Sequence, residues 1–270
     1  MLNSLRGVRV ALITGAARGI GAATAARLGA AGYGLVLVDR CADDPALGYH
    51  LSTKADLDAV VEACERAGGS ATGVVADVRD QGALDDAVAL AVERFGGLDC
   101  ALAVAGCITG GDDAWSTDDA AWSAMVGVNL EGVWRLAKAA VPALLQRPVP
   151  RRGRFVAVSS AGGTLGLPKL AAYSAAKHGV VGLMRSLAAE LGPHGITANA
   201  VAPGSTATAM LDASAAVYGL EGGSEFSVHH LLGRLVEPDE VAALLAWLCG
   251  PEADAITGAV LPVDAGMTAS

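Results

Sequence analysis

Tyr173 and Lys177 are four residues apart, and Ser160 lies thirteen residues before the tyrosine. Residues at positions i and i+4 of a helix share one face, so the lysine ammonium can lie beside the phenol. A tyrosine has an unperturbed pKa of about 10 and needs a nearby positive charge before it acts as a base at neutral pH. A serine hydroxyl can hold the substrate oxygen against the tyrosine. The three residues therefore predict a site that takes a proton from an alcohol or returns one to a carbonyl.

A glycine-rich loop follows the first apolar run of the chain. It reads Thr-Gly-Ala-Ala-Arg-Gly-Ile-Gly and places Gly15, Gly19 and Gly21 between a predicted strand and a predicted helix. Because glycine has no Cβ, backbone N–H groups and the positive end of the helix can approach a pyrophosphate. A plain glycine turn with close helix packing is the alternative, but the flanking strand and helix favour a dinucleotide site.

Asp39 ends the second apolar run, eighteen residues beyond Gly21. A carboxylate at this position binds both hydroxyls of an adenosine ribose and repels a 2′-phosphate, so the sequence predicts NAD as the cofactor rather than NADP. Arg18 and Arg40 favour the alternative, because either guanidinium can neutralise a phosphate.

The elements that must position these residues alternate along the chain. Apolar runs predict strands over residues 8–14, 35–39, 71–77, 100–105, 154–159, 197–202 and 259–263. Helical patterns cover residues 19–31, 57–67, 81–95, 115–145, 171–191 and 239–248, and the fourth breaks near Asn129. Strands without polar alternation are covered on both faces. We therefore expect one α/β domain over residues 1–270, a Rossmann fold with a doubly wound parallel sheet of about seven strands and helices on both faces.

Two segments stand outside this alternation: an insertion at residues 41–55 and a longer stretch at residues 205–236. Segments of this length commonly cover a site. The longer stretch carries more apolar side chains than an idle loop would expose, namely Met210, Leu211, Val217, Tyr218, Leu220 and Phe226. We expect it to be a lid over an apolar secondary alcohol or ketone, with packing against a neighbouring subunit as the alternative.

The composition excludes several classes of partner. A formal charge of −9 and a pI near 5.0 argue against nucleic acid and an anionic membrane as partners. The five cysteines show no Cys-x-x-Cys spacing, which favours a reduced, cytoplasmic setting. His229 and His230 are adjacent and cannot share one helical face, so we expect no metal site.

The chain resembles the short-chain dehydrogenase/reductase superfamily over nearly its whole length. The resemblance rests on six features in order: the glycine loop, Asp39, Asn129, Ser160, Tyr173 and Lys177. It implies an oxidoreductase in which the last four are catalytic. By this resemblance, Lys177 also binds the nicotinamide ribose, and Asn129 bends its helix and holds a water that passes protons to Lys177. Members of the superfamily are usually dimers or tetramers, so we expect a homo-oligomer.

The resemblance also assigns the cofactor contacts. Asp77 and Val78 flank the adenine, and Pro203, Gly204 and Thr208 lie near the nicotinamide. The full predicted set is Gly15, Arg18, Gly19, Ile20, Gly21, Asp39, Asp77, Val78, Ala105, Gly106, Tyr173, Lys177, Pro203, Gly204, Thr206 and Thr208. The chain departs from the family at Val104, where an asparagine is common, and loses an amide that ties neighbouring strands.

Residues 39–49 and the insertion that they begin are similar to the subfamily associated with the redox cofactor mycofactocin. That resemblance implies that NAD stays bound through turnover and that electrons leave through mycofactocin. Two alternatives stay open: an NADPH-dependent carbonyl reductase with exchangeable cofactor, and a non-enzymatic dinucleotide-sensing protein that kept the fold.

Overall fold

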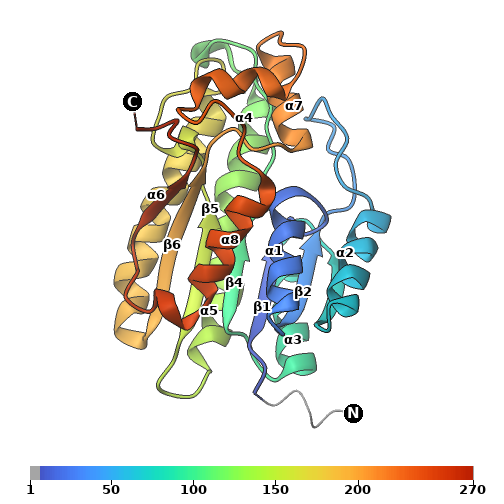
Figure 1. Cartoon of the computed structure of the whole chain (residues 1–270), viewed down its shortest axis with the longest axis vertical. Helices are drawn as coiled ribbons and strands as arrows, with labels where there is room; N and C mark the ends of the chain where they lie inside the picture. The colour runs from blue at the N-terminus through green and yellow to red at the C-terminus, as the bar shows by residue number, and fades with distance from the viewer. Residues whose placement is uncertain (1–6, 270) are drawn as a thin grey trace.

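Seven parallel strands form one sheet in the order β3-β2-β1-β4-β5-β6-β7 (Figure 1). The computed structural model describes residues 7–269, and residues 1–6 and 270 of the predicted domain lie outside the described part. The strands are β1 (Val10–Thr14), β2 (Gly34–Asp39), β3 (Ser70–Val75), β4 (Cys100–Ala103), β5 (Gly153–Val158), β6 (Ile196–Pro203) and β7 (Val260–Val263). All neighbouring pairs are parallel, which confirms the predicted doubly wound sheet.

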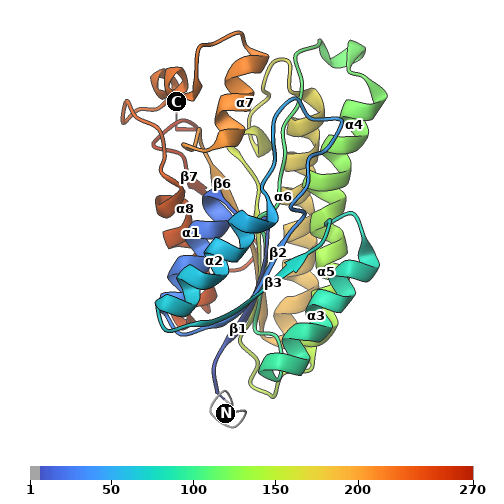
Figure 2. The ribbon, with the colours of Figure 1, turned by 90° about the vertical axis from the view of Figure 1, so that its right-hand side faces the viewer.

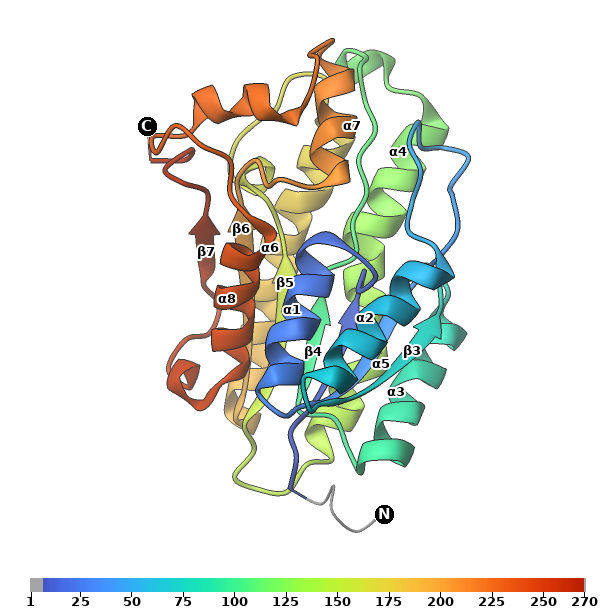
Figure 3. The ribbon, with the colours of Figure 1, turned by 45° about the vertical axis from the view of Figure 1, so that its right-hand side comes forward.

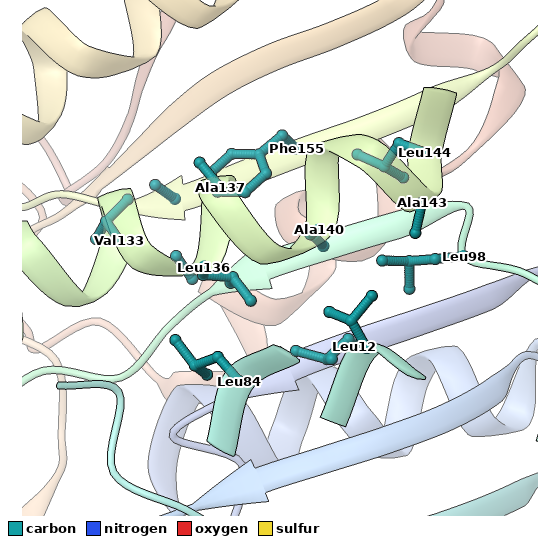
Figure 4. Close-up of a cluster of buried hydrophobic side chains, with 14 of the residues drawn as sticks. Leu12, Leu84, Leu98, Val133, Leu136, Ala137, Ala140, Ala143, Leu144 and Phe155 are labelled. Atoms are coloured by element: carbon teal, nitrogen blue, oxygen red, sulfur yellow. The ribbon is translucent and has the colours of Figure 1, made fainter. Parts of the chain in front are cut away.

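Helices cover both faces of the sheet (Figure 2). They are α1 (Gly19–Ala30), α2 (Lys54–Arg66), α3 (Gln81–Phe95), α4 (Asp119–Val126), α5 (Gly132–Leu145), α6 (Ala171–Leu191), α7 (Ala209–Val217) and α8 (Pro238–Cys249). One core cluster joins α1, α2 and α8 to the sheet, and the other joins α3, α5 and α6 to its opposite face. Figure 4 shows part of the second, where Leu136 and Leu144 of α5 lie with Leu12 of β1 and Phe155 of β5. The core residues of β1 and β5 are buried because helices lie on both sides.

The insertion ends earlier than predicted, because α2 begins at Lys54. Thr53 caps the helix: its hydroxyl accepts from the Asp56 backbone N–H at 3.2 Å, and the Asp56 carboxylate accepts from the Thr53 N–H at 2.7 Å. The prediction started this helix at residue 57 because its first turn is polar and shows no apolar period.

The predicted helix over residues 115–145 is two helices joined by a π-helical turn at Gly127–Glu131. The break near Asn129 was predicted, whereas the start at residue 115 was wrong. Asp118 is the N-cap, and its carboxylate accepts from the N–H groups of Ala120 and Ala121 at 2.9 and 3.2 Å. The four orphan N–H groups of a helix start favour such an acceptor, so α4 begins at Asp119.

The stretch at residues 205–236 contains a helix that the sequence analysis missed, α7, followed by a 3-10 segment at Gly223–His229. Its two ends are joined, because the Val236 N–H donates to the Ser205 carbonyl at 3.0 Å and the Ala207 N–H donates to the Val236 carbonyl at 2.9 Å. Figure 3 shows α7 and the insertion at the end of the molecule toward which the strand arrows point. Within residues 7–269, no helix is long and apolar enough to cross a membrane.

Candidate active site

The glycine loop packs tightly against the end of β4. Gly15 has a φ of +68°, and a Cβ at this residue would lie 2.6 Å from Ala105 Cα. A Cβ at Gly21 would lie 2.0 Å from the Gly15 carbonyl oxygen. No side chain caps the N-terminus of α1 at Arg18. The loop and the open helix end therefore form a cradle of the kind that fits a pyrophosphate.

A cavity of about 540 Å³ extends from this loop along the carboxyl ends of the strands, within the size range of small-molecule sites. The predicted cofactor residues that line it are Gly15, Arg18, Gly19, Ile20, Gly21, Asp39, Asp77, Val78, Ala105, Gly106 and Thr208. Five others, Tyr173, Lys177, Pro203, Gly204 and Thr206, are not among its lining residues. The cavity thus brings together the residues predicted for the adenosine and pyrophosphate half.

The Asp39 carboxylate is held by three donors. Its Oδ2 accepts from the Ala17 N–H at 3.0 Å, and its Oδ1 accepts from the Cys41 N–H at 3.2 Å and from Ser52 Oγ at 2.6 Å. Ser52 comes from the insertion and was not predicted, because nothing in its local sequence indicates this contact. The carboxylate is therefore fixed in orientation beside the glycine loop.

Both arginines that favoured NADP have partners in the structure. Arg18 donates to the His50 carbonyl at 2.9 Å, and its guanidinium lies 6.0 Å from the centre of the Tyr49 ring. Arg40 pairs with Asp44 at 2.5 Å and with Asp77 at 3.3 Å. Their positive charges are therefore directed to groups of the protein.

Tyr173 and Lys177 of α6 are both buried. The Lys177 ammonium lies 5.7 Å from the centre of the Tyr173 ring and donates to the Val158 carbonyl at 3.0 Å. Burial lowers the pKa of Lys177 to about 8. Burial raises the pKa of Tyr173, and a hydrogen bond with Ser160 opposes that rise. The structure thus brings Tyr173, Lys177 and Ser160 together.

Ser160 and its neighbour Ser159 have different environments. Ser159 Oγ donates to the Lys177 carbonyl at 2.9 Å and is buried. Ser160 Oγ accepts from the Gly162 N–H at 3.0 Å and is partly exposed. Ser160 is therefore the more accessible of the two, and it is the one that lowers the pKa of Tyr173 against the effect of burial.

Asn129 is buried in the π-helical turn. Its Nδ2 donates to the carbonyls of Cys107 and Met125, both at 3.0 Å, and its Oδ1 accepts from the Cys107 N–H at 3.2 Å. A Cβ at Gly106 would lie 3.0 Å from Asn129 Oδ1 and 3.5 Å from Lys177 Nζ. Asn129 and Lys177 therefore converge on Gly106.

The backbone near Val104 is tied to the neighbouring strand without a side-chain amide. Thr14 Oγ1 accepts from the N–H groups of Val104 and Ala105 at 3.2 and 3.3 Å and donates to the Leu102 carbonyl at 3.4 Å. These bonds join β1 to the end of β4, so the departure from the family leaves this connection in place.

The other predicted contacts follow β6. Thr206 Oγ1 donates to the Gly204 carbonyl at 3.0 Å, and Thr208 Oγ1 donates to the Thr206 carbonyl at 3.2 Å. His230, which the sequence analysis considered only as a metal ligand, accepts from the Ser205 N–H at 3.2 Å through Nε2. Its Nδ1 lies 2.6 Å from the Arg234 carbonyl, so Nδ1 carries the proton. His230 therefore shapes the turn after β6, and residues 7–269 contain no cluster of metal-binding side chains.

An apolar cluster surrounds Tyr173. Its buried members are Cys107, Ile108, Ala124, Met125, Leu170, Ala172 and Tyr173. Leu47 and Tyr49 from the insertion and Met210, Val217 and Tyr218 from residues 205–236 pack against it. The Tyr49 hydroxyl accepts from the Ile108 N–H at 3.2 Å, and the Tyr218 hydroxyl donates to the Pro168 carbonyl at 2.7 Å. Both segments outside the strand-helix alternation thus contact the cluster around the predicted site.

Comparisons with known proteins identify the family of this chain. A family described as enoyl-(acyl carrier protein) reductase matches residues 15–268. The (−)-trans-carveol dehydrogenase of Rhodococcus erythropolis is 40% identical over 271 residues, which cover 96% of this chain and 97% of that protein. The carveol dehydrogenase of Mycobacterium avium in complex with NAD superposes with a TM-score of 0.92 at 36% identity, covering 98% of this chain and 99% of that one. A short-chain dehydrogenase of Mycobacterium paratuberculosis bound to NAD gives a TM-score of 0.88 at 32% identity, covering 97% and 98%. The chain belongs to the short-chain dehydrogenase/reductase superfamily and is an NAD-dependent oxidoreductase acting on CH–OH groups.

Proposed function

We propose that the protein interconverts an apolar, alicyclic secondary alcohol, such as a terpenoid alcohol, and its ketone. The observation that carries this proposal is the buried Tyr173, with Lys177 over its ring and Ser160 near enough to influence its pKa, inside an apolar cluster. An apolar surround favours a substrate whose only polar group is the reacting oxygen. The similarity to a carveol dehydrogenase supports the same class of substrate.

In the proposed mechanism, Ser160 Oγ binds the substrate oxygen and Tyr173 removes the hydroxyl proton. Lys177, with a pKa of about 8, carries a positive charge at neutral pH and so favours the tyrosinate. We propose that Asn129 shapes the turn beside Lys177 and holds a water through which the proton leaves. NAD bound beside this site would supply the acceptor for the hydride that leaves the substrate carbon.

The residues proposed to hold NAD are the predicted set. The glycine cradle would bind the pyrophosphate, Asp39 the adenosine ribose, and Asp77 and Val78 the adenine edge. Ala105 and Gly106 would lie along the middle of the cofactor, and Pro203, Gly204, Thr206 and Thr208 near the nicotinamide. The restricted space for a Cβ at Gly15 and Gly21 supports a backbone approach to the ligand.

We propose that NAD stays bound during turnover and is reoxidised in place through mycofactocin. Three bonds hold the insertion in place: Ser52 to Asp39 and Arg18 to His50 beside the glycine loop, and Tyr49 to Ile108 at the cluster around Tyr173. Each bond must open before that segment can lift, and this slows the escape of a ligand held beneath it.

The test of cofactor retention is mass-spectrometric identification and quantitation of the nucleotide released by denaturing the extensively dialysed protein. Near-stoichiometric NAD or NADH supports the bound-cofactor proposal. An empty protein that turns over with added NAD indicates an ordinary exchanging dehydrogenase, and bound NADP overturns the assignment of Asp39. Rapid reduction of bound NAD by an alicyclic alcohol, with slow turnover until mycofactocin is added, would support the electron route.

We also propose a single domain, with residues 205–236 as substrate lid, that forms a dimer or tetramer in the cytoplasm. Two half-exposed tryptophans, Trp122 of α4 and Trp134 of α5, support pairing through these helices. The cysteines are all free, in line with a reducing compartment. Sedimentation of the purified protein checks the oligomeric state.

A further inference from the structure

Asp44, in the insertion, lies between two guanidinium groups. Its Oδ2 is 2.5 Å from Arg40 Nη1 and 2.9 Å from Arg79 Nη2. Its Oδ1 accepts from the Ala46 N–H at 3.0 Å. The residue is 7% exposed, so water screens these contacts little. Asp44 is therefore fixed with both charged contacts made at once.

The same two arginines also share Asp77. Arg79 binds its carboxylate through Nε and Nη2 at 2.6 to 3.1 Å, and Arg40 Nε lies 3.3 Å away. Two guanidiniums and two carboxylates thus form a closed group without net charge. A planar guanidinium donates in fixed directions, so the donors that Arg40 and Arg79 use here are not available to another anion in this arrangement.

Three members of this group, Arg40, Asp44 and Asp77, line the adenosine end of the cavity, and Arg79 contacts both carboxylates from outside the lining set. Asp39, Arg40, Asp44 and Asp77 all line the cavity, and Asp39 and Arg40 are consecutive residues at the end of β2. An arginine near this position is what accommodates the 2′-phosphate of NADP. Without the charge of Asp44, the two guanidiniums would share only Asp77 and keep one net positive charge beside the ribose.

We propose that Asp44 is a specificity-determining residue that withholds Arg40 and Arg79 from a 2′-phosphate. Discrimination against NADP is then divided between two carboxylates: Asp39 repels the phosphate directly, and Asp44 occupies the cations that would bind it. This inference rests on the proposed position of the adenosine ribose beside Asp39. It assigns to the insertion a role in cofactor choice, separate from cofactor retention.

The test compares equilibrium binding of NAD and NADP to protein stripped of nucleotide with charcoal, measured by calorimetry. Asp44→Asn keeps an oxygen for the Ala46 N–H and replaces the Oδ2 that faces both arginines by an NH2 group, so it removes the charge together with their shared acceptor. We expect the ratio of the NADP Kd to the NAD Kd to fall roughly tenfold, equivalent to about 1.4 kcal/mol. Asp58→Asn removes the same charge from the exposed face of α2, where Asp58 pairs with Lys54, and should leave the ratio unchanged.

The expected gain in relative NADP affinity must come from Arg40, which Asp44→Asn releases. Adding Arg40→Gln to Asp44→Asn should therefore restore the native ratio of the two Kd values. A folded Asp44→Asn protein with the native ratio overturns the proposal, as does an equal change in Asp58→Asn.

A second comparison does not need Asp44→Asn to fold. In an Asp39→Ser background, Arg40→Lys, which keeps the charge of the group and removes only the guanidinium, should weaken NADP binding less than about threefold, because Asp44 still holds the cation. A loss of tenfold or more there would show that Arg40 is free to bind phosphate. These experiments measure binding constants and do not depend on catalytic activity. They can therefore succeed or fail independently of the proposed alcohol oxidation.

Discussion

Ser52 Oγ donates to Asp39 Oδ1 at 2.6 Å, and this bond joins the last part of the insertion to the last residue of β2. The residue predicted to recognise the ribose therefore also anchors the segment that covers it. Any movement of the insertion away from the cavity must break a hydrogen bond to a buried carboxylate, which is among the stronger kinds in proteins.

Removing this anchor should loosen the cofactor. Ser52→Ala leaves the Asp39 carboxylate one donor short, at a cost of about 1–3 kcal/mol. We expect NAD to leave the protein roughly tenfold faster, measured as the release rate after dilution into an NAD scavenger. Ser116→Ala, at an exposed serine, is the control. Equal release rates in all three proteins would exclude a role of this bond in retention.

Tyr173→Phe should abolish most of the turnover without affecting the fold. The substitution removes the one group proposed to take the proton, and general acid–base catalysis contributes about 10²–10⁴-fold to rate. Turnover of an alicyclic alcohol is measured together with the affinity for NAD. A variant that turns over like the wild type would move the proton transfer to another residue.

The buried Lys177 should make stability depend on pH. Burial lowers its pKa to about 8 from an ordinary value of 10.5, so between these pH values the unfolded chain keeps a proton that the folded protein has lost. The free energy of unfolding should therefore rise with pH across this window. Lys177→Met has no ammonium group at this position, so it lacks this pH-dependent contribution to the free energy of unfolding. Urea unfolding at pH 8 and pH 10 should show the wild type gaining about 2 kcal/mol more than the variant, since one pKa unit equals about 1.4 kcal/mol. A parallel pH dependence in the two proteins would argue against a lowered pKa.

Gly15→Ala should destabilise the protein. Its φ of +68° disfavours any side chain, and the added Cβ would lie 2.6 Å from Ala105 Cα. We expect a loss of about 1–3 kcal/mol in the free energy of unfolding, together with weaker NAD binding. Gly182→Ala in α6 has no atom within 4 Å of its new Cβ and should be stabilising by about 0.4–1 kcal/mol. If Gly15→Ala leaves the free energy of unfolding unchanged, the glycine loop has room to shift.

The sheet was predictable because its strands are unbroken apolar runs and its glycine loop marks one strand-to-helix turn. The bounds of α3 and α6 were correct because their apolar period continues to both ends. By contrast, α7 was missed because it is short and lies in a segment without a clear polar face. The polar first turn of α2 hid its start, which depends on the capping bonds of Thr53.

The predicted site residues were found from their order along the chain, whereas their partners were not. Ser52, Asp44 and His230 act through contacts with residues distant in sequence or through a turn whose shape only the fold determines. The pairing of Arg40 is an example: from sequence alone it favoured the NADP alternative, and its geometry directs it to Asp44. Spacing predicts which residues share a helix face, but not which charged groups neutralise one another.

The hydrogen bonds that join Ser205 and Ala207 to Val236 have a consequence for how this enzyme could diversify. Because the chain leaves and re-enters the domain at one point, the segment between them is a closed appendage on the sheet. Lengthening such a loop costs little, since each doubling of its length costs only about 0.6 kcal/mol. Beyond Thr206 and Thr208, which are proposed to contact the cofactor, the sequence of this segment can therefore be exchanged between relatives with little effect on the strands, and substrate range can change while the cofactor-binding residues stay constant.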